Sequence, residues 1–251
     1  MRVRLSYAPP RARLTLSHSP LNVFDGDMLK ELSRGLDDIG SRTDVHVVIL
    51  DSAEKVFSAG VDVRDHLPER LNEMLERFHG VCRQLLRLDA ITLALVSGHA
   101  FGGAMELLAC CDFVIATDEA AFAQPEIDLA CFPPLGAAIY PKLLGSKRAA
   151  EIVLLGRRLS AREAEDFGLV TKVVSEDALQ AEAEVLLRSL AEKSPAALRI
   201  AKKALRLGLP RALEGLEEIE ALYRDELAAT EDMVEGLRAF LEKRKPIFRG
   251  K

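Results

Sequence analysis

The chain has 251 residues, of which 49% are hydrophobic and 29% are charged. This is enough apolar material for one large globular domain or two modest ones, and it excludes a disordered or fibrous chain. With 34 Lys and Arg against 39 Asp and Glu, the formal net charge is -5, so there is no overall positive field for nonspecific nucleic-acid binding.

Apolar segments rich in β-branched residues alternate with helical patterns along the first two thirds of the chain. Strands are predicted at 11–16, 45–50, 91–96, 113–117 and 169–174, and helices at 27–39, 68–88 and 103–111. Such alternation is typical of parallel strands joined by crossover helices. The sequence therefore predicts an α/β fold with substantially buried sheets.

From Ser160 onward the pattern becomes helical. Ser160 and Glu163 have the spacing of a capping box, which opens this part of the chain. Amphipathic helices are predicted at 177–192, 195–207, 211–229 and 231–244. A helical appendage of this size often packs against a neighbouring subunit, so we expect an oligomer.

The most informative stretch is ITLALVSGHAFGGAMELLACCD, residues 91–112, in which Glu106 is the single formal charge before the final residue. A strand, a turn and the Gly102-Gly103 pair opening a helix would present free backbone N–H groups, which bind developing negative charge. Glu106 follows Gly103 by one helical turn, so that a carboxylate and an N–H donor can flank one small substrate. The alternative is that the glycines only allow tight helix packing and that Glu106 pairs with an arginine.

Two further segments carry candidate chemistry. In Phe57-Ser-Ala-Gly-Val-Asp62, small residues let main-chain N–H groups approach a ligand, and Asp62 can cap the next turn of the chain; a plain turn is the alternative. In Phe122-Ala-Gln-Pro-Glu126, a proline fixes the backbone before a second carboxylate in apolar company. Two carboxylates facing one pocket can divide acid and base work, whereas a capping or ion-paired Glu126 is the alternative.

Several other functions lose support from the sequence. No His, Cys, Asp and Glu set has metal-ligand spacing, no GxSxG occurs, and the GHAFGGAME run lacks the order of a dinucleotide or Walker loop. The four cysteines have no CxxC spacing, and Cys110 and Cys111 lie inside an apolar run, as buried reduced thiols do. The N-terminal stretch has no secretory apolar segment and no membrane-spanning run occurs, so we expect a soluble, cytoplasmic protein without a membrane partner.

In this order and spacing the segments resemble the crotonase superfamily, the enoyl-CoA hydratase and isomerase family, over essentially the whole chain. The resemblance rests on 57–62, on Gly102-Gly-Ala-Met-Glu106 with Cys111-Asp112, on Gln124-Pro-Glu126, and on 235–245. It implies a crotonase-like spiral of ββα repeats over 1–190. A helical C-terminal region over 191–251 would then build homotrimers, commonly paired into hexamers.

The same resemblance implies the positions of the site. It puts the oxyanion hole on the backbone N–H groups of Val61 and Gly103, which would polarise an acyl-CoA thioester carbonyl and stabilise its enolate. It makes Glu106 and Glu126 the catalytic acids that activate water and deliver a proton to the α-carbon. CoA, which is part of the substrate and leaves no need for a cofactor, would lie against Ala59, Asp62, Val63, Arg64, Phe240 and Lys243. Arg64 replaces a commoner lysine there.

One departure from the family pattern concerns the pocket floor. Ordinary hydratases continue after the second glutamate with a Pro-Gly-x-Gly-Gly run, whereas this chain has Phe132, Pro133 and Pro134. Pro134 has no N–H to donate, so a backbone contact to the catalytic water would be lost. Together with 57–63 and 65–69, this segment resembles the cyclohexa-1,5-diene-1-carbonyl-CoA hydratases.

The sequence therefore predicts a carbon-oxygen lyase that adds water to, or removes it from, an unsaturated acyl-CoA, with a cyclic dienoyl-CoA as a candidate. Enoyl-CoA isomerisation or another enolate-forming reaction is the alternative among enzymes, since it shares the oxyanion hole but need not use both acids. Outside enzymes, the alternative is a non-catalytic acyl-CoA-binding or RNA-binding relative. The acidic balance and the two glutamates speak against that alternative.

Overall fold

The fold is built on a six-stranded sheet with strand order β1-β2-β3-β4-β6-β9. In this computed structural model, which describes residues 1–207 and 215–251, the strands are β1 (Val3–Ala8), β2 (Arg11–Leu16), β3 (Val47–Ser52), β4 (Ile91–Val96), β6 (Phe113–Thr117) and β9 (Lys172–Val174). All neighbours from β2 onward pair in parallel, so the predicted α/β architecture is confirmed. β4 is buried along its whole length, as its continuous apolar sequence requires.

A second, smaller sheet contains β5 (His99–Phe101), β7 (Ala121–Ala123) and β8 (Leu159–Ser160). Each of two successive turns of the chain adds one strand to each sheet and then a helix, since β4, β5 and α3 (Gly103–Ala109) are followed by β6, β7 and η2 (Pro125–Leu129). An isolated β-bridge between Ser58 and Ala100 connects the preceding turn of the spiral to the small sheet. These are the ββα repeats that the resemblance implies.

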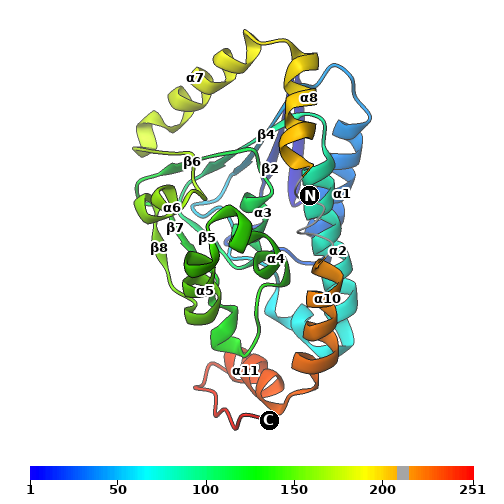
Figure 1. Cartoon of the computed structure of the whole chain (residues 1–251), viewed down its shortest axis with the longest axis vertical. Coiled ribbons are helices and arrows are strands. Elements are labelled where there is room, and N and C mark those ends of the chain that lie inside the picture. The colour runs from blue at the N-terminus through cyan, green and yellow to red at the C-terminus, as the bar shows by residue number, and fades with distance from the viewer. Residues whose placement is uncertain (208–214) are drawn as a thin grey trace.

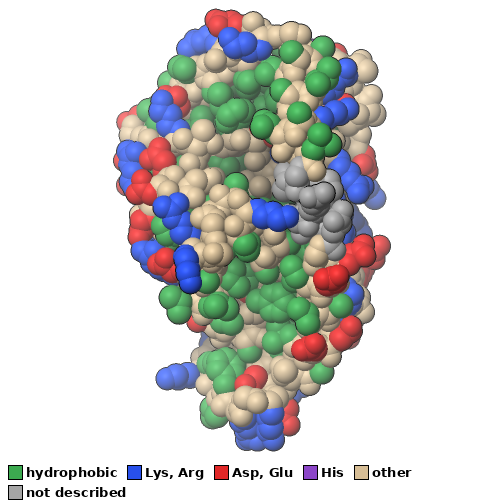
Figure 2. Space-filling view, in the orientation of Figure 1, with side chains coloured by type: hydrophobic (Ala, Val, Ile, Leu, Met, Phe, Trp, Pro, Cys, Tyr) green, Lys and Arg blue, Asp and Glu red, His purple; other side chains and the backbone are tan. Residues whose placement is uncertain are grey.

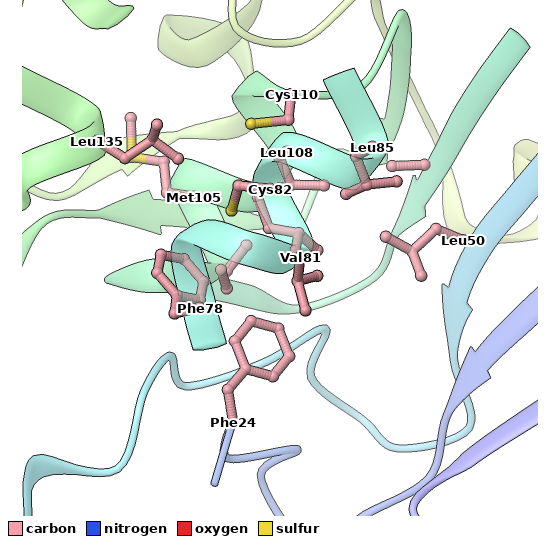
Figure 3. Packing of buried hydrophobic residues seen from close by; sticks show 14 of the residues in the cluster. Phe24, Leu50, Phe78, Val81, Cys82, Leu85, Met105, Leu108, Cys110 and Leu135 are labelled. Carbon is pink, nitrogen blue, oxygen red and sulfur yellow. The ribbon is translucent and has the colours of Figure 1, made fainter. Parts of the chain in front are cut away.

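Two long helices, α1 (Gly26–Gly40) and α2 (Pro68–Arg87), pack against each other beside the large sheet (Figure 1). In α2 the buried side chains recur at helical spacing, from Leu71 through Leu75 and Phe78 to Cys82. Figure 3 shows Phe78 facing Phe24, and their ring centroids lie 6.4 Å apart. This core fixes α2 against α3, and the two helices together form one wall of a cavity.

The short 3-10 turn η1 (Val63–His66) precedes α2, and the remaining helices follow the second turn of the spiral. They are α4 (Pro134–Leu143), α5 (Ser146–Leu155), α6 (Ala161–Phe167), α7 (Leu179–Ala191), α8 (Pro195–Arg206), α10 (Leu216–Ala221) and α11 (Glu231–Leu241), with the 3-10 turns η3 (Glu176–Ala178) and η5 (Leu227–Ala229) and the π-helical η4 (Leu222–Glu226). The capping box is present: Ser160 accepts from the N–H of Glu163, whose side chain accepts in return. In Figure 1, α7 and α8 lie at one end of the molecule and α11 at the other.

Several of the predicted boundaries need correction. The strand predicted at 169–174 is reduced to β9, because the N–H groups of Leu169 and Val170 both bond to the carbonyl of Ala164 and close the end of α6 instead of pairing. The strand predicted at 45–50 lies two residues later as β3. The helix predicted at 103–111 ends at Ala109.

The helix predicted at 211–229 is wrong as a single element. Its residues 211–214 lie outside the described residues, and the rest divides into α10, η4 and η5. The edge strand β1 and the short strands of the small sheet are also unpredicted. β1 buries only Val3, and runs of two or three residues are too short to show alternation.

The C-terminal helices attach to the core through buried charges. In α8, Lys202 Nζ lies 2.6 Å from the carbonyl oxygen of Ala90 and 2.7 Å from Asp112 Oδ2, and Arg206 lies 2.6 Å from Asp112 Oδ1. The predicted division of the chain into a spiral core, 1–190, and a helical C-terminal region, 191–251, stays a prediction. Across the described ranges, no helix is long and apolar enough to cross a membrane. All four cysteines there are free, and three of them are buried.

Candidate active site

One cavity brings together residues from six elements of the spiral and the helical tail: η1, α2, α3, η2, α4 and η4. Among the predicted site residues, it is lined by Ala59, Val61, Val63, Gly103, Glu106, Glu126, Phe132, Pro133 and Pro134. Apolar side chains such as Met74, Leu75 and Phe78 form much of the rest of its wall. The segments at 57–62, 102–106 and 124–126, far apart in sequence, therefore meet at one site.

Two backbone N–H groups face this cavity. The N–H of Phe24 donates to the carbonyl of Gly60 at 2.8 Å, and the carbonyl of Phe24 accepts from the N–H of Asp62 at 3.3 Å. These two hydrogen bonds form a β-bridge between Phe24 and Val61, so the N–H of Val61 points away from Phe24. Gly103 is the first residue of α3, and its N–H therefore has no acceptor within the helix. Neither N–H donates a hydrogen bond to any group in the described ranges.

The two loops that carry these donors are held very close. A Cβ at Gly60, where φ is 91°, would lie 2.7 Å from the carbonyl oxygen of Phe101 and 3.2 Å from the nitrogen of Gly103. A Cβ at Gly103 would lie 2.8 Å from Val61 Cγ2. Only glycine fits at both positions, because the backbones must approach closely for the donors to converge. Two backbone donors that converge in this way can stabilise a negative charge that develops on a bound oxygen.

Glu106 is buried in α3, with 4% of its surface exposed. Its Oε1 accepts a hydrogen bond of 2.7 Å from the N–H of Gly136, in the first turn of α4. Burial raises the pKa of Glu106, while the charge of His79 and the N–H groups of Gly136 and Leu135 act in the opposite direction. Among the described residues, Glu106 forms no ion pair with an arginine. Its carboxylate instead contacts the backbone N–H of Gly136 at the N-terminus of α4.

The unusual floor explains this contact. Pro134 occupies the first position of α4, where a missing N–H costs nothing because that group has no intrahelical acceptor. The next free N–H groups of the first turn are then available to Glu106. Pro134 thus removes one donor from the floor, as expected, while Gly136 supplies another.

Glu126 lies at the start of η2, after Pro125. Its Oε2 is buried without a hydrogen-bond partner among the described residues, and Oε1 lies so close to Gly102 that a Cβ there would be 2.9 Å away. Burial and the charge of Glu106 raise the pKa of Glu126 to about 8. Two acids in one cavity therefore differ in environment: Glu106 accepts from the N–H of Gly136 in α4, whereas Oε2 of Glu126 has no partner among the described residues.

Comparison with known proteins decides the family. The family model described as enoyl-CoA hydratase/isomerase matches residues 12–251. The chain belongs to this family. It is accordingly a member of the crotonase superfamily and an enzyme of the enoyl-CoA hydratase type.

Individual members of the family show how far the likeness extends. The cyclohexa-1,5-dienecarbonyl-CoA hydratase of Thauera aromatica is 34% identical over 233 residues, which are 92% of this chain and 90% of the relative. The crystal structure of an enoyl-CoA hydratase from Bacillus anthracis is 31% identical, with a TM-score of 0.79 and full coverage of both chains. A methylmalonyl-CoA decarboxylase in complex with 2-nitronate-propionyl-CoA is 25% identical, with a TM-score of 0.89, covering 100% of this chain and 99% of the other.

Four of the residues that we predicted to bind CoA do not line the cavity. Asp62 caps η1 by accepting from the N–H of Arg64 at 2.9 Å, and the Arg64 guanidinium pairs with the same carboxylate and lowers the pKa of Asp62. Phe240, 53% exposed, lies at the end of α11, a helix that packs against η1 and η2, and the exposed Lys243 lies in the turn after that helix. Their role toward CoA stays a prediction.

The structure adds three residues to the site that the sequence did not single out as functional. His79 and Tyr223 line the cavity, and Glu220 binds His79 from behind. A signal for His79 was present, since it follows Leu75 by four residues and so lies beside the apolar stripe of α2. No comparable signal marks Glu220 or Tyr223, which lie in an amphipathic tail whose polar and apolar residues read as ordinary helix faces.

Proposed function

We propose that the protein is a hydratase that adds water to the double bond of an unsaturated acyl-CoA, or removes it in the reverse direction. The observation that carries the proposal is one cavity in which the buried Glu106 and the half-buried Glu126 lie beside two free backbone N–H groups, those of Val61 and Gly103. Membership of the enoyl-CoA hydratase/isomerase family supports the same reaction.

The reaction follows from the positions of these groups. The thioester oxygen accepts hydrogen bonds from Val61 and Gly103, which stabilise the negative charge that develops there. Glu106, whose N–H donors oppose the rise in its pKa that burial causes, takes a proton from water as the water oxygen bonds to the β-carbon. The electron pair of the double bond moves to the thioester as an enolate. Glu126, whose pKa of about 8 keeps it protonated near neutral pH, then delivers a proton to the α-carbon.

Retention of both acids in one cavity favours hydration over isomerisation, which needs no activated water. We propose a cyclic dienoyl thioester as the preferred acyl group. Its support is the rigid floor of Pro133 and Pro134, the edge-on packing of Phe132 against Tyr223 at 5.0 Å, and the 34% identity to the Thauera hydratase. A pocket wall of aromatic rings and prolines has flat, rigid surfaces, which suit the planar ring of a cyclic acyl group better than a flexible acyl chain.

The experiment is turnover of the purified protein with crotonyl-CoA and cyclohexa-1,5-diene-1-carbonyl-CoA in parallel, followed by mass spectrometry for the gain of one water. A higher kcat/KM for the dienoyl ester supports the cyclic substrate. A higher value for crotonyl-CoA makes the protein a general hydratase with an unusual floor. Product of unchanged mass but shifted double bond, or no reaction with either ester, rejects hydration of these substrates.

We also propose that the protein assembles as a homotrimer or a hexamer of two trimers. Figure 2 shows hydrophobic side chains gathered between α7 and α8. On these two helices, Val185, Ile200 and Leu205 are 50%, 63% and 84% exposed. Apolar surface of this kind is typical of an interface. Light scattering on the purified protein gives the oligomer mass, and a monomer contradicts the proposal.

A further inference from the structure

Two polar side chains of the active-site cavity take no part in the proposed reaction. They are His79 on α2 and Tyr223 on η4, and each is 1% exposed. Nε2 of His79 and the hydroxyl oxygen of Tyr223 are buried without a hydrogen-bond partner among the described residues. Both side chains line the same cavity as Glu106 and Glu126. An unpaired buried polar atom is costly, so two of them in one cavity call for a ligand.

The C-terminal part of the chain brings these two side chains to one wall of the cavity. Nδ1 of His79 lies 2.6 Å from Oε1 of Glu220 on α10. Tyr223 follows Glu220 by about one helical turn, so the two residues share a helix face. Tyr223 is the residue that the π-helical η4 buries, and its ring packs edge-on against Phe132 with the centroids 5.0 Å apart. The imidazole and the phenol therefore border the same part of the cavity.

The surroundings of the two groups set what each can bind. A carboxylate only accepts hydrogen bonds, so Nδ1 of His79 donates to Glu220, and Nε2 of the neutral imidazole is left as an acceptor. Burial, followed by the neighbouring Cys131, raises the pKa of Tyr223, so the phenol keeps its hydrogen as a donor. The thiol of Cys131 donates to the carbonyl of Leu129 at 3.6 Å. Because sulfur is a weak acceptor, the hydrogen of the phenol remains for a ligand.

Resting on the proposed hydratase function, we propose that His79 and Tyr223 form a subsite for a hydroxyl group on the acyl part of the substrate. A hydroxyl accepts from the phenol and donates to Nε2, whereas a plain hydrocarbon that fills the cavity leaves both atoms unpaired. The substrate is then a cyclic dienoyl-CoA with a hydroxyl on a saturated ring carbon, away from the carbons that react. A site built to bind a substrate hydroxyl discriminates strongly against the analogue that lacks it.

Binding of unreactive thioesters tests the subsite without turnover. The probes are cyclohexanecarbonyl-CoA and its 3-hydroxy and 4-hydroxy derivatives, each titrated into the full chain by calorimetry. We expect the wild type to bind at least one hydroxylated ester about tenfold or more tightly than the plain ester. Tyr223→Phe removes only the hydroxyl, so it should lose this preference while its affinity for the plain ester stays within about threefold. Equal affinities of the wild type for all three esters overturn the inference.

Two further variants separate the subsite from a general effect on the protein. Tyr7→Phe is the matched control, because it removes a phenolic hydroxyl that binds Asp38 at 2.7 Å outside the cavity. It should keep the wild-type preference. His79→Asn keeps a donor for Glu220 but has no counterpart of Nε2, so it should lose the preference as Tyr223→Phe does. A preference that survives in both Tyr223→Phe and His79→Asn overturns the inference.

Turnover separates failure of this inference from failure of the proposed function. The substrates are cyclohexa-1,5-diene-1-carbonyl-CoA and its 3-hydroxy and 4-hydroxy derivatives. We expect Tyr223→Phe to lower kcat/KM about tenfold or more for the preferred hydroxylated ester and less than about threefold for the plain ester. Hydration without any preference for a hydroxyl overturns the inference and leaves the hydratase proposal in place. Tyr223-dependent binding of a hydroxylated ester, by a protein that hydrates none of these substrates, supports the inference and rejects the hydratase proposal.

Discussion

Glu106 Oε1 lies 2.7 Å from the backbone nitrogen of Gly136, at the positive end of α4. This contact gives Glu106 a stabilising donor, whereas Oε2 of Glu126 has no partner among the described residues. In the proposed mechanism, this difference between the two carboxyl groups helps to make Glu106 the base and Glu126 the acid.

The first prediction concerns pH. Hydration needs a protonated Glu126, whose pKa is raised by burial and by the charge of Glu106 to about 8. The proton is present below that value and lost above it, so kcat/KM for hydration should fall as the pH rises through about 8. The pH profile of the wild-type enzyme measures this fall. In Glu126→Gln the alkaline limb should disappear, and an activity that increases through the same range would contradict the assignment.

The second prediction concerns the oxyanion hole. In Gly103→Ala, the new Cβ would lie 2.8 Å from Val61 Cγ2 and 3.0 Å from Phe78 Cζ, so it crowds the space between the two donors. We expect kcat to fall by about 10²-fold or more, as when one oxyanion donor is lost. Gly80→Ala on α2 is the matched control, since a Cβ there meets nothing within 4 Å. It should keep full activity and stabilise the fold by about 0.5–1 kcal/mol in thermal unfolding. Equal losses in both variants would refute the local explanation.

The third prediction concerns the attachment of α8. Lys202→Met removes the Nζ that contacts Asp112 and the carbonyl of Ala90, leaving buried acceptors with fewer donors. We expect a loss of about 3 kcal/mol in urea unfolding. Lys203→Met breaks only the exposed pair with Asp89 and should change stability by less than about 1 kcal/mol. Similar costs for the two variants would argue against a buried network.

The same network predicts acid sensitivity. Burial tends to raise the pKa of Asp112, but the charges of Lys202 and Arg206 outweigh it and lower that pKa. A lowered pKa means that the stabilisation is complete above the ordinary aspartate range and is lost as the pH falls through the folded value. The stability difference between the wild type and Lys202→Met should therefore shrink on acidification. A difference that grows at low pH would contradict this account.

The sequence predicts the elements with long or strongly periodic patterns best. The strands at 11–16, 91–96 and 113–117 are confirmed at both ends. Residues 11–16 alternate polar and buried apolar side chains, whereas 91–96 and 113–117 are apolar runs bounded by charged or glycine-containing turns. The short strands of the second sheet leave no such pattern, and the π-helical η4 interrupts an amphipathic stretch that reads as one helix. Local sequence carries periodicity but not the tertiary contacts that end an element.

At the site, the motif residues meet in one cavity as predicted, since the spiral brings successive loops to the same edge. The contact of Gly136 with Glu106 was beyond prediction, because it depends on where Pro134 starts α4. Glu220 could not be assigned either, since its partner His79 lies 141 positions away in the chain. Pairings over such distances are set by packing alone.

The most direct test of the account is mass-resolved hydration by Glu106→Gln and Glu126→Gln beside the wild type, with CoA-ester binding measured for all three. Glutamine preserves size but can neither accept the proton of water nor deliver one to carbon. The account predicts that each variant loses about 10²- to 10⁴-fold in kcat while the dissociation constant for the ester stays within a few fold. Wild-type turnover in both variants would contradict it.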